Sequence, residues 1–156
     1  MKTVHPAHWS HWLAVGFGSG LSPWAPGTLG SLVGLLLFLP LSQLPLMYYL
    51  FVVVLTSIAG IWICGKTAKD WGTHDHGAIV WDEIAGQLLA LSAMALTPFN
   101  LIAAFILFRF FDILKPWPIS WADRKVSGGL GIMLDDILAG AFAWLVLMLV
   151  NRFVFG

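Results

Sequence analysis

The sequence predicts an all-α protein, a polytopic membrane bundle of about five hydrophobic helices, and three observations lead to this prediction. Apolar residues make up 59% of the 156 residues and charged residues only 10%, against a usual ~45–50% and ~25%. A chain of this length buries only about 70% of its surface on folding, so a mean hydropathy of +0.86 would leave large apolar areas in water. In addition, charged residues are absent from several stretches that are long enough to form helices.

The charged residues are concentrated in two windows, Lys66–Glu83 and Arg109–Asp136, which contain all eight carboxylates. Proline and glycine divide the remaining sequence into five candidate helices. These are Leu29–Leu39, Leu46–Cys64, Ile84–Leu96, Leu101–Phe111 and Ile137–Phe155. The second and fifth have nineteen residues each, enough to cross a ~30 Å hydrocarbon core, whereas the first is short enough to be re-entrant. We expect one membrane-embedded domain over residues 1–156.

Alternating crossings would place both charged windows on the same side of the membrane. Five of the basic residues would then share that side, which the positive-inside rule makes cytoplasmic. They are Lys66, Lys69, Lys115, Arg124 and Lys125. The first twelve residues do not resemble a cleavable signal peptide, so insertion is expected from the body of the chain. The single cysteine, Cys64, permits no intrachain disulfide, and a net charge of zero excludes a basic field for nucleic acid.

Two adjacent pairs of carboxylates, Asp82–Glu83 and Asp135–Asp136, are each expected to begin a helix. One acid there would cap the helix and compensate its dipole, but two neighbouring acids repel each other. Two such pairs at one membrane face are better explained by Mg²⁺, which prefers hard oxygen ligands and substrate phosphate. Small residues follow each pair and would let the two helices approach closely: Ala85, Gly86, Ala139 and Gly140.

The segment FRFFDILKPWP places Arg109, Asp112 and Lys115 on one face of a helix. Ionisable residues at membrane depth are expensive enough to suggest function. Arg109 and Lys115 would clamp phosphate oxygens, with Asp112 as a metal ligand or general base. The alternative is that Arg109 and Asp112 pair only to mask each other's charge.

Two flanking segments carry further candidates. In WADRKVSGGLG, Asp123 is either catalytic or an ordinary loop acid, and Arg124 and Lys125 are expected to form a surface patch attracted to anionic lipid. The glycines that follow permit a loop with positive φ. In GFGSGLSPWAPGTLGS, Thr28 is expected as an N-cap, and Thr28 and Ser31 as phosphate contacts at a helix start. A flexible interfacial loop is the alternative there. His74, Asp75 and His76 could coordinate a metal, but the loop offers no further ligands, so the sequence leaves the roles of the two histidines open.

Four segments together resemble the signature blocks of the phosphatidylglycerophosphatase A family. They are PGTLGS (26–31), HDHGAIVWDEIAG (74–86), FRFFDILKPWPISWADR (108–124) and GGLGIMLDDILAG (128–140). The resemblance shows no departure at the acidic or basic positions. It implies a Mg²⁺-dependent enzyme of the bacterial inner membrane that removes the terminal phosphate of phosphatidylglycerophosphate to give phosphatidylglycerol.

We expect the chemistry to occur at the cytoplasmic membrane face, where a lipid phosphate and the carboxylates would meet. Water would attack the phosphorus in line while the basic residues neutralise the phosphoryl charge. The carboxylates expected to hold one or two Mg²⁺ are Asp82, Glu83, Asp135 and Asp136. An aspartyl-phosphate intermediate is the competing mechanism. A phosphatase of another lipid phosphate is the nearest alternative function, and an ion-binding or transport protein is disfavoured because the helix interiors carry no charge. The sequence leaves the oligomeric state open.

Overall fold

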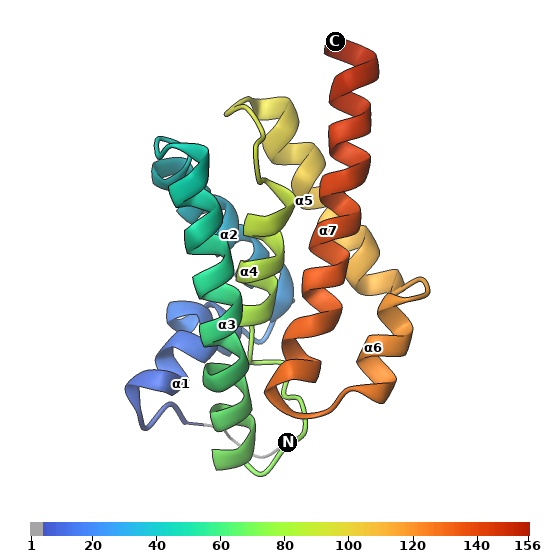
Figure 1. Ribbon diagram of the computed structural model, residues 1–156. Helices are drawn as coiled ribbons and strands as arrows, with labels where there is room; N and C mark the ends of the chain where they lie inside the picture. The colour runs from blue at the N-terminus through green and yellow to red at the C-terminus, as the bar shows by residue number, and fades with distance from the viewer. Residues whose placement is uncertain (1–4) are drawn as a thin grey trace.

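The computed structural model describes residues 5–156, and all regular secondary structure in that range is helical. Helix α7 packs against α3, α4, α5 and α6, and the short helix α4 lies at the centre, where it also contacts α2 and α3 (Figure 1). The elements are α1 (Trp9–Ala14), the 3₁₀ segment η1 (Gly16–Leu21), α2 (Pro26–Leu41), α3 (Leu46–Asp70), α4 (Trp81–Ala90), α5 (Pro98–Leu114), α6 (Ile119–Lys125) and α7 (Gly128–Phe155). The all-α class is therefore confirmed for the described residues.

Two helices, α3 with 25 residues and α7 with 28, are long and apolar enough to cross a membrane. Large apolar side chains along α3, among them Met47, Phe51 and Ile58, are more than 60% exposed. Exposed apolar surface of this extent is typical of contact with lipid. Helix α2 is apolar but shorter. These features are consistent with membrane association.

Helix α7 begins at Gly128, well before the expected Ile137. The prediction that Asp135 and Asp136 begin this helix is therefore wrong, since both lie inside it. Only Gly128 of the glycine-rich segment has positive φ, at 72°. Gly129 is helical instead, and a Cβ added to it would lie 1.8 Å from the carbonyl oxygen of Ile61. A glycine here allows the backbones of α3 and α7 to touch. In the sequence, such a glycine cannot be distinguished from one that forms a loop.

Several other boundaries also differ from the predicted ones: α3 continues to Asp70, and α5 extends from Pro98 to Leu114. Helix α2 begins at Pro26, so Ala25 and not Thr28 occupies the N-cap position. Proline suits the first helical position because its missing N–H would have no partner there. Helix α4 ends at Ala90, earlier than expected, and is followed by a turn in which Ala93 has a φ of 60°.

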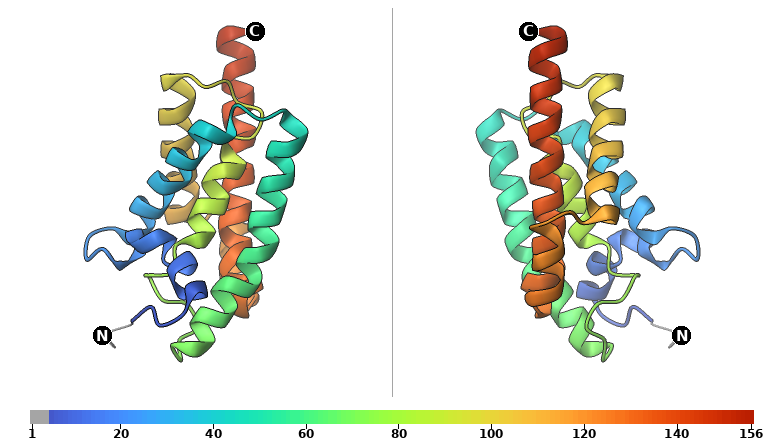
Figure 2. Two further views of the ribbon diagram at one scale, coloured as in Figure 1. Left: turned by 90° about the vertical axis from the view of Figure 1, so that its left-hand side faces the viewer. Right: turned by 90° about the vertical axis from the view of Figure 1, so that its right-hand side faces the viewer.

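The two charged windows come together at one end of the molecule (Figure 1). The loop between α3 and α4 and helix α6 lie toward this end, whereas the α2–α3 and α4–α5 connections lie at the opposite end. The side views show α3 and α7 running along most of the length of the molecule (Figure 2), and Figure 1 shows the shorter α4 between them. The direction of the chain thus follows the alternation that the charge pattern predicted.

Candidate active site

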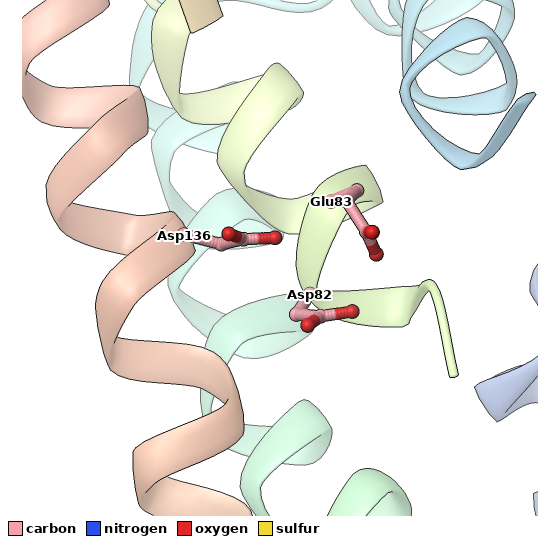
Figure 3. Close-up of side chains that lie close together, drawn as sticks. All are labelled: Asp82, Glu83 and Asp136. Carbon is pink, nitrogen blue, oxygen red and sulfur yellow. The ribbon is translucent and has the colours of Figure 1, made fainter. Parts of the chain in front are cut away.

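Three carboxylates from two helices meet near the centre of the bundle (Figure 3). Asp82 and Glu83 lie in the first turn of α4, and Asp136 extends from α7 toward them. One oxygen of each side chain lies within 4.8 Å of the others. Asp82 is 8% exposed and Asp136 only 3%. We call these three residues the carboxylate cluster.

The cluster forms because α4 and α7 cross at two glycines. A Cβ added to Gly140 would lie 2.4 Å from the carbonyl oxygen of Gly86, and one added to Gly86 would lie 2.7 Å from the carbonyl oxygen of Asp136. A side chain at either position would force the two helices apart. The prediction that small residues after each acidic pair allow a close approach is confirmed.

Each residue of the carboxylate cluster has a buried oxygen without a hydrogen-bond partner: Asp82 Oδ1, Glu83 Oε2 and Asp136 Oδ2. Within residues 5–156, no lysine or arginine forms an ion pair with any of the three. Buried carboxylates without a counter-charge are strongly destabilising, so natural proteins pair them or use them to coordinate a metal. Hard oxygen ligands at this spacing fit a divalent cation such as Mg²⁺.

Asp135 does not join the cluster. The Lys115 ammonium donates hydrogen bonds of 2.6 Å both to Asp135 Oδ2 and to Asp123 Oδ1. Partial burial opposes the charge on Lys115, but the two hydrogen-bonded carboxylates outweigh this effect and raise its pKa above the ordinary value. Lys115 is therefore fully charged at neutral pH. A cavity of about 170 Å³ lies beside this arrangement, and its lining includes His74, Asp75, Asp123 and Asp135.

Arg109 and Asp112, three residues apart on α5, form an ion pair in which both side chains are mostly buried. Arg109 Nε is buried and has no partner. A Cβ added to Gly27 would lie 3.3 Å from Arg109 Nη1 and 2.5 Å from Glu83 Oε1. The first turn of α2 therefore lies directly against both a guanidinium group and the carboxylate cluster.

Thr28 and Ser31, the other predicted phosphate contacts, both lie at the start of α2. Thr28 is half-buried in the first turn. Ser31 is fully buried, and its hydroxyl donates a 2.9 Å hydrogen bond to the carbonyl oxygen of Gly27. The hydroxyl proton of Ser31 is thus used within the helix, whereas the backbone N–H groups of the first turn have no intrahelical partner.

One polar group that the sequence analysis did not single out accompanies the site. Gln87 is fully buried on α4, one turn after Glu83, and neither of its amide atoms has a partner in the described chain. A polar residue four positions after an acid in an apolar helix was the available signal. Elsewhere, His11 Nε2 lies 2.9 Å from Asp70 Oδ2, which Lys66 also contacts, so a polar contact connects α1 to the C-terminal end of α3.

Comparisons with known proteins give one consistent result. The sequence model of the family described as phosphatidylglycerophosphatase A matches residues 12–151. A protein of that name from Escherichia coli (strain K12) is 51% identical, over 85% of this chain and 78% of the relative. Its namesake from Haemophilus influenzae is 49% identical, over 90% and 88%. A Bacteroides thetaiotaomicron protein, provisionally named a phosphatidylinositol-3-phosphatase, is 40% identical, over 92% and 94%. No solved structure matches the chain.

Proposed function

The chain belongs to the phosphatidylglycerophosphatase A family and is accordingly a phosphatase of phosphatidylglycerophosphate, and we propose that it acts with Mg²⁺. We place the reaction at the cytoplasmic face of the bacterial inner membrane, with the chain crossing several times. The single observation that carries the metal assignment is the carboxylate cluster, whose three residues each have a buried oxygen without a partner and form no ion pair within residues 5–156.

Asp82, Glu83 and Asp136 are the residues proposed to hold the metal. Bound Mg²⁺ would act as a Lewis acid toward the phosphate and favour deprotonation of the attacking water. Asp112, which lies beside Asp136, is the proposed further ligand or general base. Asp135, the fourth ligand expected from the sequence, is left out of this proposed set because its carboxylate accepts a hydrogen bond from the Lys115 ammonium and lies outside the cluster.

The phosphate group is proposed to bind between Arg109 and the start of α2. The N–H groups of Gly27 and Thr28 are in the first turn of a 16-residue helix and favour an anion. The guanidinium of Arg109 and the ammonium of Lys115 would neutralise the charge that the phosphoryl group carries in the transition state. Phosphomonoester hydrolysis is among the slowest uncatalysed reactions, so this positive charge must supply much of the acceleration.

A phosphatase of another lipid phosphate is the second candidate, and the Bacteroides relative is the observation that favours it. Both substrates present a phosphomonoester at a membrane surface, so the proposed metal and phosphate sites would serve either. Relative kcat/KM for phosphatidylglycerophosphate, phosphatidic acid and phosphatidylinositol 3-phosphate would separate the two candidates. We expect the first to exceed the others by at least tenfold.

The deciding experiment measures phosphate release from phosphatidylglycerophosphate by the purified protein with Mg²⁺, with chelator, and in the variants Asp82→Asn and Asp136→Asn. Activity should require Mg²⁺ and fall strongly in both variants. Asp70→Asn is the matched control, because Asp70 is an ion-paired carboxylate at the C-terminal end of α3 and is not part of the carboxylate cluster. Undiminished activity in chelator or in both cluster variants would overturn the metal proposal. Oxygen exchange into phosphate, or trapping of labelled enzyme, would separate water attack from an aspartyl-phosphate intermediate.

A further inference from the structure

A further cavity lies at α6, and none of its lining residues belongs to the carboxylate cluster. It has a volume of about 220 Å³ and is lined by Trp117, Ser120, Trp121, Arg124 and Lys125. We call it the α6 pocket. Trp117 is 79% exposed and Trp121 53%, so the pocket opens at the surface with its aromatic side chains uncovered.

The charge of the α6 pocket is entirely positive. Arg124 and Lys125 form no ion pair within residues 5–156, whereas Lys66, Arg109 and Lys115 each do. Arg124 follows Ser120, and Lys125 follows Trp121, by four residues on α6, so the cations and the polar side chains project from neighbouring parts of one helix surface. No carboxylate is among the lining residues described, so the lining favours an anion.

The pocket is attached to the active site through the same short helix. Asp123 of α6 accepts a hydrogen bond from Lys115, and Lys115 also holds Asp135, the neighbour of Asp136 in the carboxylate cluster. Ile119 and Ala122 are fully buried and fix α6 against the rest of the protein. Asp123 on α6 thus contacts Lys115, while other residues of α6 line the pocket with tryptophan and cationic side chains.

We propose that the α6 pocket binds the phosphodiester headgroup of an anionic glycerophospholipid. Tryptophan side chains favour the headgroup level of a membrane, and a guanidinium and an ammonium group suit phosphate oxygens that a serine hydroxyl can also reach. The phosphodiester has two sources with the same chemistry: that of the substrate molecule itself, or that of a neighbouring anionic lipid. The inference rests on the proposed function only in placing α6 at a membrane surface.

Native mass spectrometry of the detergent-solubilised full chain tests the pocket directly, with phosphatidylglycerol as the anionic probe and phosphatidylcholine as the zwitterionic one. The variant Arg124→Gln/Lys125→Gln should bind phosphatidylglycerol about tenfold more weakly, which corresponds to about 1.4 kcal/mol. Trp121→Leu should weaken binding in the same direction. The charge-matched control is Lys69→Gln/Arg152→Gln, which removes two other cations that form no ion pair in the described part of the chain and should bind as the parent does.

Equal phosphatidylglycerol binding by the parent and Arg124→Gln/Lys125→Gln would overturn the proposal, as would an equal loss in the control variant. Because binding is measured without turnover, this result is independent of whether the protein releases phosphate. Kinetics in phosphatidylcholine vesicles then separate the two sources. If the phosphodiester belongs to the substrate, KM rises about tenfold in the double variant. If it belongs to a neighbouring lipid, added phosphatidylglycerol lowers KM for the parent but not for the variant.

Discussion

Asp135 and Asp136 are adjacent on α7, yet they occupy opposite electrostatic environments. Asp135 is 6% exposed and is neutralised by Lys115 at 2.6 Å. Asp136 is 3% exposed, faces α4, and has an oxygen with no partner in the described chain. The protein supplies the counter-charge for one carboxylate and leaves the other to be compensated from outside. The proposed metal site is therefore distinguished by a buried carboxylate without an ion-pair partner, and not simply by the presence of acidic residues.

The difference follows from helix geometry. Successive residues of an α-helix are rotated by about 100°, so the adjacent side chains of Asp135 and Asp136 leave α7 in different directions. Asp136 is directed to α4, where Gly86 and Gly140 bring the backbones together. Asp135 is directed to the corner between α5 and α6.

The largest expected effect comes from Asp136→Asn, which removes a carboxylate of the cluster. We expect kcat/KM for phosphatidylglycerophosphate to fall by about 10³-fold, because a metal ligand and its electrostatic contribution are lost together. Asp135→Asn is the matched comparison on the adjacent residue and should reduce activity by only about tenfold. Equal losses in the two variants would show that the adjacent carboxylates do not differ in role.

The next prediction tests the ion pair between Lys115 and Asp135. Lys115→Met should lower kcat/KM by about 10²-fold, since a cation proposed to face the phosphoryl group is lost. It also leaves Asp135 buried without a partner, so the free energy of unfolding should fall by about 1–3 kcal/mol in chemical denaturation. In Asp135→Asn/Lys115→Met, much of that destabilisation should be recovered. A double variant as unstable as the sum of the singles would argue against the pairing.

Much of this arrangement could be predicted from residue types, but the different environments of Asp135 and Asp136 could not. The all-α class followed from the apolar composition, and the meeting of the two acidic segments followed from the small residues that succeed them. To predict that Asp135 and Asp136 point in different directions, one must know that α7 begins at Gly128. The glycines of GGLG obscured this start because they suggested a loop. A glycine in a turn and a glycine at a helix contact look alike in a single sequence, and only packing against Ile61 distinguishes them.

A smaller effect is expected when the crossing that creates the cluster is widened. In Gly140→Ala the new Cβ would meet the carbonyl oxygen of Gly86, so α7 must shift away from α4. We expect a loss of about 1–3 kcal/mol in the free energy of unfolding, with reduced Mg²⁺-dependent activity. Gly77→Ala is the control, because nothing lies within 4 Å of a Cβ there. Unchanged stability in Gly140→Ala would mean that the crossing is loose.

The last prediction concerns the thermal response to Mg²⁺, which is the most direct measure of the contrast between the two carboxylates. A ligand that binds only the folded protein stabilises it by about 2.7 kcal/mol at a hundred times its Kd. Mg²⁺ should therefore raise the Tm of the parent and of Asp135→Asn by several degrees, but leave Asp136→Asn unchanged. Without Mg²⁺, Asp136→Asn should be at least as stable as the parent, because it removes an uncompensated buried charge. A parent Tm that does not respond to Mg²⁺, or an Asp136→Asn variant that responds equally, would place the cation elsewhere.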